Sequence, residues 1–158
     1  YFNRQKIYKK RFEVLKLKSL TLSKGVIALN NTEVSSIISS EIVSEILEKL
    51  ERFERNKQFL AVDINLHSLA KKLHTNQNYL SRVINLKMEK NFSQYLSDLR
   101  IEYALEELKN NPVFRKYSVK AIANECGFKT SESFSKAFYK EVGIYPSYYI
   151  KELDKEAM

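Results

Sequence analysis

The sequence predicts an all-α protein with two helix-turn-helix subdomains joined by a long central helix. An amphipathic helix and a basic N-terminal segment are expected to precede them. Three observations predict this fold. Apolar residues recur at helical spacing after residue 40. The 158 residues include only three glycines and two prolines, too few for an all-β fold with many tight turns. A pattern that begins at Asn65 occurs a second time from Ser118.

Composition also excludes several kinds of functional site. The three glycines lie far apart, whereas a phosphate-binding loop or a dinucleotide fingerprint needs them clustered. The single cysteine, Cys126, excludes an internal disulfide and a Cys-rich zinc site, and its spacing predicts a place in the core. His67 and His74 are too few to build a catalytic grouping. We therefore expect no metal, no cofactor and no enzymatic activity.

The net charge of +8 indicates an anionic partner, either nucleic acid or a membrane surface. This charge is unevenly distributed: residues 1–18 hold +6, the linker at 19–39 is neutral, residues 40–65 hold −2, and residues 66–158 hold +4. The basic segment at 1–18 is compatible with a DNA-binding arm, with a solvated tail, or with the inner flank of a transmembrane helix. The third interpretation is favoured because Tyr1 and Phe2, followed by Lys and Arg, match an aromatic belt with positive-inside charge.

The first predicted helix is amphipathic and covers residues 40–58. Ile42, Ile46, Leu50 and Phe53 form its apolar stripe, and i,i+4 pairs of Glu with Lys or Arg occupy the other face. We expect this helix to pack on the domain that follows, at residues 59–158.

The repeat then predicts two pairs of helices, at 66–73 with 77–88 and at 119–126 with 131–142. Asn65 and Ser118 are N-cap residues that open each copy, and Ala70 and Ala123 fill the same place, where a small side chain lets another helix approach. The offset between the copies changes from 53 to 54 residues within the turn, where a change in length is tolerated.

Two further helices complete the predicted fold. A long helix at 92–110 lies between the two pairs, and Asn91 and Gln94 at its start have capping-box spacing. A last helix at 146–156 is expected because Pro146 suits a first helical turn.

The short first helix and tight turn of each pair favour a helix-turn-helix over an antiparallel hairpin. The second helix of each pair also begins with small polar residues, as a recognition helix that reaches base edges does. A helical bundle that serves protein interaction or a membrane surface, without base readout, remains the alternative.

Residues 60–152 resemble the C-terminal DNA-binding domain of the AraC/XylS family of bacterial transcription regulators. The most specific motifs are Ile122–Phe128, Phe134–Phe138 and Gly143–Tyr149, and Tyr79–Asn85 agrees less distinctively. The order of basic segment, linker and domain also resembles the cytoplasmic end of membrane-anchored regulators with a tetratricopeptide or sensor-kinase-like N-terminal part.

The resemblance implies two helix-turn-helix units, at 66–88 and 118–142, that place recognition helices in successive major-groove segments of double-stranded DNA. The residues implied in base contact are Asn78, Ser81, Arg82, Glu132, Ser133 and Lys136. Those implied in backbone contact are Thr75, Gln77, Thr130, Ser131, Lys87 and Lys140. Structural positions are Ala70, Ala123, Gly127, Phe128, Phe134, Phe138, Gly143, Pro146 and Tyr149. Further implied are contact with RNA polymerase, a homodimer formed through parts outside the domain, and a cytoplasmic location.

Three residues depart from the pattern. His74 stands where the second copy has the turn glycine Gly127, which leaves the shape of the first turn open. Glu89 stands in the place of Gly143. Glu132, at a base-facing position, repels phosphate and can only accept hydrogen bonds, for example from cytosine N4.

Overall fold

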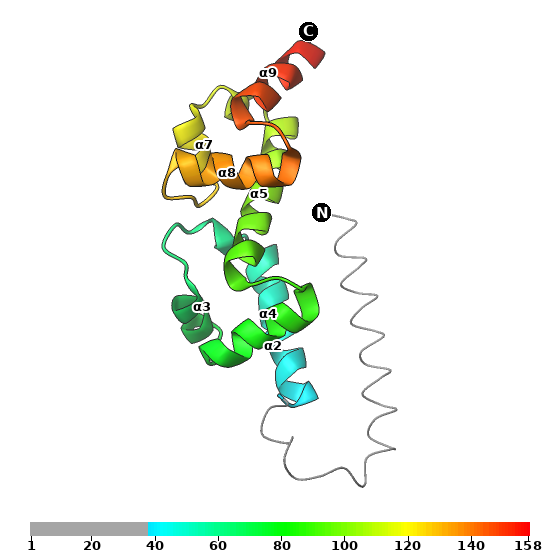
Figure 1. Ribbon diagram of the computed structural model, residues 1–158, viewed down its shortest axis with the longest axis vertical. Helices are drawn as coiled ribbons and strands as arrows, with labels where there is room; N and C mark the ends of the chain where they lie inside the picture. The colour runs from blue at the N-terminus through cyan, green and yellow to red at the C-terminus, as the bar shows by residue number, and fades with distance from the viewer. Residues whose placement is uncertain (1–37) are drawn as a thin grey trace. The chain divides into compact units, whose positions relative to one another are not determined.

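The computed structural model describes residues 38–158, and this part of the chain is α-helical apart from short connections (Figure 1). The basic segment at 1–18 lies outside the described residues, as does the linker at 19–39 except for its last two residues. Residues from Glu45 to Met158 form one compact unit.

Helix α2, Ser40–Arg55, buries Ile46, Leu50 and Phe53 at the predicted helical spacing. It is shorter than the predicted 40–58 because Lys57 has a left-handed backbone, with φ of 52°, which no α-helix continues. The 3-10 helix η1, Gln58–Leu60, follows and turns Phe59 into the core, where its ring makes an edge-to-face contact with Phe53 at a centroid distance of 6.4 Å.

The two helix pairs are α3 with α4 and α7 with α8. Their bounds are α3 Leu66–Lys72, α4 Gln77–Met88, α7 Val119–Glu125 and α8 Ser131–Val142. A side-chain oxygen caps each N-terminus by accepting a main-chain N–H, and the four caps are Asn65, Asn76, Ser118 and Thr130. At Asn65 the cap is reciprocal, since the Ser68 hydroxyl accepts the N–H of Asn65 in return.

The turn inside each pair has the same backbone path in both copies. In the first, the N–H of His74 donates to Lys71 O and that of Thr75 to Ala70 O; in the second, Gly127 donates to Asn124 O and Phe128 to Ala123 O. These are the two bonds of a Schellman motif. His74 has φ of 54° and Gly127 φ of 88°, so histidine at the glycine position does not change the turn.

Helix α5, Phe92–Asn110, runs from the first pair to the second and contacts both α4 and α8 (Figure 1). The side chain of Asn91 caps it by accepting the N–H of Gln94. A short helix that the sequence did not reveal, α6 at Pro112–Arg115, follows directly, and α9 spans Pro146–Glu156 with Pro146 in its first turn.

Each pair closes its own core against α5. On the first pair, Tyr95, Leu96 and Leu99 of α5 are buried, as are Leu80 and Val83 of α4. The second core is one cluster, made of Ile101, Ala104, Leu108, Phe114, Ile122, Ala123, Cys126, Phe128, Phe134 and Phe138. The fold is thus all-α, with two helix-turn-helix units on one central helix.

Candidate nucleic-acid interface

Helices α4 and α8 present corresponding exposed side chains. Asn78 and Arg82 are exposed on α4, and Glu132 and Lys136 are exposed on α8. Asn78 and Arg82 are four residues apart, as are Glu132 and Lys136, so the two side chains on each helix share one helix face. The opposite face is buried, because Leu80, Val83 and Ile84 of α4, and Phe134 and Phe138 of α8, lie in the core.

The N-caps fix how the two helices correspond. Asn76 caps α4 and Thr130 caps α8, an offset of 54 residues. In this register Asn78 corresponds to Glu132, and Arg82 to Lys136. The remaining two predicted base contacts are not equivalent to each other: half-buried Ser81 corresponds to Ser135, and exposed Ser133 corresponds to Tyr79.

The hydroxyl of Ser133 is engaged in capping its own helix. It donates to Thr130 O at 3.0 Å and accepts from the Thr130 hydroxyl at 3.0 Å, while the main-chain N–H of Ser133 donates to Thr130 Oγ1 at 3.1 Å. A base contact would compete with these bonds, so Ser133 is less suited to base readout than Lys136.

Tyr79 is an exposed residue of the same helix end that the sequence reasoning missed. It is 37% exposed and follows Asn78 in the first turn of α4. The 54-residue offset was a usable signal, because it pairs Tyr79 with Ser133, which was predicted as a contact.

The predicted backbone contacts differ in accessibility. Lys140 and Thr130 are exposed, whereas Ser131 is half-buried. The amide of exposed Gln77 is hydrogen-bonded to His67 Nδ1 at 2.9 Å. Lys87 is half-buried, and this burial lowers the pKa of its ammonium.

Thr75 belongs to the turn and not to the recognition helix. It takes the place that Phe128 holds in the second copy, where the ring is buried against Phe134 at a centroid distance of 5.4 Å. Thr75 is half-buried and precedes Asn76, the N-cap of α4, so it is not part of the exposed face of that helix.

Most of the predicted structural residues are buried, in the core or in the turns before and after α4 and α8. The fully or nearly buried ones are Ala70, Ala123, Gly127, Phe128, Phe134, Phe138 and Pro146. Half-buried Tyr149 packs its ring against Phe138 at 5.5 Å. Gly143 ends α8 with a left-handed φ of 83°, and Glu89 ends α4 in the same way with φ of 56°.

The described part of the chain, residues 38–158, contains no group of three or more His, Cys, Asp or Glu side chains placed to hold a metal ion. None of its helices combines the length and apolar character needed to cross a bilayer.

The two units lie almost entirely within a match to a known protein family. A family model described as "Helix-turn-helix domain" matches residues 69–152. An uncharacterised HTH-type transcriptional regulator of Bacillus subtilis, YtdP, is 34% identical over 87 residues, which are 55% of this chain and 11% of that protein. The Msm operon regulatory protein of Streptococcus mutans is 31% identical over 90 residues, 57% of this chain and 31% of that protein. The chain thus spans less than a third of the length of these relatives.

Solved structures share the fold of this chain. The C-terminal domain of AraT, a response regulator from Geobacillus stearothermophilus, has a TM-score of 0.57 and 30% identity, and the match covers 74% of this chain and 88% of that one. The DNA-binding domain of AdpA, solved with a target DNA, has a TM-score of 0.56 at 19% identity, covering 75% and 96%, and this likeness shows the fold alone. The family is a class of DNA-binding domains and not of enzymes. The chain belongs to this helix-turn-helix family, the DNA-binding domain of AraC-type transcription regulators.

Proposed function

We propose that α4 and α8 read double-stranded DNA in two successive major-groove segments, and that the chain binds a specific bipartite sequence. The observation that carries this proposal is the corresponding exposed face of two helices that are each capped by a side-chain oxygen, with Asn78 and Arg82 on one and Glu132 and Lys136 on the other. The N-terminal part of a recognition helix is the part that contacts base edges. AdpA, whose DNA-binding domain shares this fold, was solved with a target DNA, and this supports DNA as the ligand.

The four side chains suit different bases. Arg82 can donate two hydrogen bonds to O6 and N7 of guanine, and Asn78 can pair with N6 and N7 of adenine. In the second unit Lys136 can donate to guanine, whereas the Glu132 carboxylate can only accept, as from cytosine N4. We therefore expect a half-site with guanine and adenine under α4 and a different half-site under α8.

The dimensions of α5 suit this arrangement. Its 19 residues give a rod about 28 Å long at 1.5 Å per residue. Recognition helices that enter successive major-groove segments on one face of B-DNA are about 34–36 Å apart. A rigid helix of nearly this length, with one unit at each end, supports binding to two half-sites about one turn apart.

Selection from random DNA, followed by a single substitution, tests the proposal. Arg82→Ala should weaken binding to the selected site by about 1–3 kcal/mol and relax the preference at one base pair, because a bidentate contact is lost. The matched control is Lys140→Ala, which removes an exposed cation on α8 and should weaken binding about equally on all sequences.

Two results would refute sequence-specific reading. One is a selection that enriches no motif with two half-sites about one turn apart. The other is an Arg82→Ala loss that is equal on selected and on random DNA, which would make Arg82 a phosphate contact. Failure of the selection would favour a helical module for protein interaction or a membrane surface.

We propose further that the whole protein regulates transcription in the cytoplasm, contacts RNA polymerase, and forms a homodimer through parts outside this domain. The two relatives are named as a transcriptional regulator and as an operon regulatory protein, and the chain spans only a fraction of each. We also propose a membrane anchor just upstream, because residues 1–18 hold most of the excess charge and combine it with Tyr1 and Phe2. The full-length gene tests this last point: an upstream region without an apolar stretch of about 20 residues would exclude the anchor.

A further inference from the structure

Arg100 is buried in the middle of α5, and it is the only buried charged residue in the described part of the chain, with 8% exposure. Its Nε donates to Phe59 O at 2.7 Å, and its Nη2 donates to Ala61 O at 2.7 Å. Both acceptors are main-chain carbonyls of η1 and the residue after it. The guanidinium thereby ties the central helix to the segment that leads into α3.

The turn of the second unit also lies against this guanidinium. Its Cζ is 5.7 Å from the centroid of the Phe128 ring, within the range of a cation–π contact. Gly127 is packed so closely that a Cβ atom there would lie 2.7 Å from Arg100 Nε and 2.9 Å from Leu60 O. The turn between α7 and α8 therefore rests directly on Arg100 and on η1.

This junction joins the segment that enters the first helix-turn-helix unit to the turn of the second unit. Phe59 and Ala61 belong to the chain that enters the first unit, and Gly127 and Phe128 belong to the turn that precedes the second recognition helix. The planar fork of a guanidinium fixes the direction of both hydrogen bonds, which a lysine ammonium cannot do. Such a group can set an angle as well as a distance.

We propose that Arg100 is a positioning residue that fixes the distance and angle between the two recognition helices, and hence the spacing of half-sites that the protein accepts. This inference rests on the proposed function, because it concerns how two DNA-reading units are held together. Arg100 is buried away from solvent, so the proposal involves no contact between Arg100 and DNA.

Arg100→Lys tests the proposal, because it keeps the charge and most of the stem but loses the fork. With the full chain, affinity for the selected bipartite site should fall about 10-fold or more. Affinity for DNA that keeps one half-site and randomises the other should change by less than about threefold. The loss that the wild type shows when one base pair is inserted or removed between half-sites should shrink in the variant.

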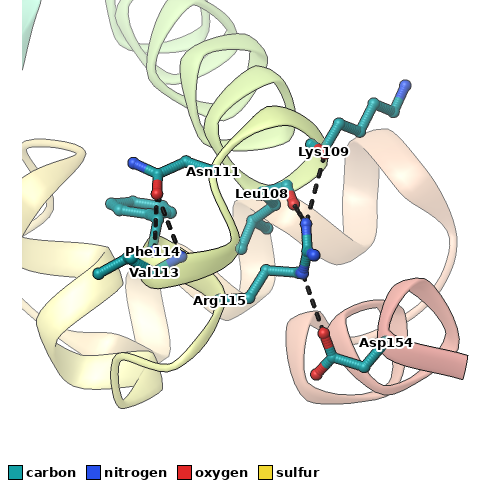
Figure 2. Close-up of polar contacts among 7 residues, drawn as sticks. All are labelled: Leu108, Lys109, Asn111, Val113, Phe114, Arg115 and Asp154. Carbon is teal, nitrogen blue, oxygen red and sulfur yellow. Dashed lines mark hydrogen bonds and ion pairs between the residues drawn. The ribbon is translucent and has the colours of Figure 1, made fainter. Parts of the chain in front are cut away.

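Arg115 provides a matched control from the same chain. Its Nη1 donates to Leu108 O at 2.7 Å and Lys109 O at 3.3 Å, and its Nε pairs with Asp154 at 2.9 Å (Figure 2). Like Arg100, Arg115 donates to two main-chain carbonyls, and it adds an ion pair, but all these partners belong to the C-terminal half. Arg115→Lys should lower thermal stability and leave the preference for half-site spacing unchanged.

Phe128→Leu perturbs the same junction at the ring that contacts the guanidinium, and it tests the positioning role if Arg100→Lys does not fold. It removes the ring beside the guanidinium and should relax the spacing preference in the same sense. An unchanged spacing preference, or an equal loss on half-sites and on the bipartite site, would overturn the positioning role. A wild-type protein that selects no bipartite site would instead overturn the proposed function.

Discussion

At the scale of the residue, His74 and Glu89 adopt backbone torsions that glycine adopts at the matching places in the second unit. Their φ values are 54° and 56°, against 88° at Gly127 and 83° at Gly143. A residue with a Cβ is strained in this region by about 1–2 kcal/mol, whereas glycine is not. The first unit therefore carries a conformational cost that the second avoids.

His74→Gly and Glu89→Gly should each raise the free energy of unfolding by about 0.5–1 kcal/mol, because relief of strain exceeds the added entropy of the unfolded chain. Chemical denaturation measures this.

The reverse change, Gly143→Ala, should be destabilising by a similar amount, since no atom lies within 4 Å of the new Cβ and only the torsion matters. Gly127→Ala should cost more because its Cβ also meets Arg100 and Leu60. Equal losses at positions 127 and 143 would contradict this packing argument.

Glu132 has opposite effects on stability and on binding. It is the acidic residue in the first turn of α8, where the helix dipole favours a negative charge, yet it lies on the face proposed to approach DNA, whose phosphates repel it. Glu132→Gln should lower stability by about 0.3–1 kcal/mol and raise affinity for random DNA about two- to fivefold. Thermal melting and a salt-controlled binding titration check the two effects. An unchanged affinity for random DNA would place Glu132 away from DNA.

At the scale of the element, the helices most accurately predicted are those whose signals are local. The starts of α4, α5, α8 and α9 were predicted at the residue observed. For α5 and α9 the signals were Asn91 and a first-turn proline, and for α4 and α8 they were small polar residues followed by apolar residues at helical spacing. The ends of short α3 and α7 fell one residue earlier, where Leu73 and Cys126 begin the turn.

Two elements were not predictable in this way. Helix α6 has only four residues, too few to show periodicity. Asn111, which follows the predicted end of the long helix, caps α6 by accepting from Val113 and Phe114 (Figure 2). The 3-10 helix η1 depends on distant partners, because Phe59 packs against both Phe53 and Tyr103. Contacts of this kind are absent from local sequence patterns.

Helix α2 is stabilised by the first helix-turn-helix unit and stabilises it in return. Lys49 Nζ donates to Leu73 O at 2.7 Å, and the Tyr95 hydroxyl donates to Glu54 at 2.8 Å. Leu50→Ala should therefore cost about 2–5 kcal/mol of unfolding free energy for the whole unit, as expected for a fully buried leucine. Exposed Glu48→Ala on the same helix is the control and should change it by less than about 0.5 kcal/mol. A small loss at Leu50 with cooperative unfolding of the rest would show that α2 is dispensable.

At the scale of the whole molecule, the buried Cys126 links stability to pH. Burial raises the pKa of this thiol from 9.0 to about 12, with Glu125 and Glu107 adding to the shift. Because the folded state holds the proton more tightly, this contribution to stability is complete below pH 9 and is lost as pH rises from 9 towards 12.

Comparison of the wild type with Cys126→Ala isolates this effect from the titration of tyrosines and lysines. Between pH 8 and pH 10.5 the wild type should lose more unfolding free energy than the variant, by up to about 1.4 kcal/mol for each pH unit above 9. The constant offset caused by the smaller side chain does not affect the slope. Parallel stability curves for the two proteins would show that the thiol ionises as readily when folded.

The arrangement of the two units was the part least accessible from sequence. The repeat predicted two similar units and a rod between them, but a charged residue such as Arg100 on a long helix is ordinarily read as solvated. Its burial becomes apparent only when η1 and the second turn are brought to it. For the proposed interface, the exposed pairs on α4 and α8 followed from motif position, and base contact by them stays a prediction.

The junction at Arg100 has a consequence for how binding sites change in a genome. If two carbonyls and one ring hold the reading helices apart, single base changes in an operator weaken binding stepwise, whereas an inserted base pair disrupts it at once. Operators of this protein should then align without gaps. Their spacer length should be shared by sites whose base sequences have otherwise drifted apart.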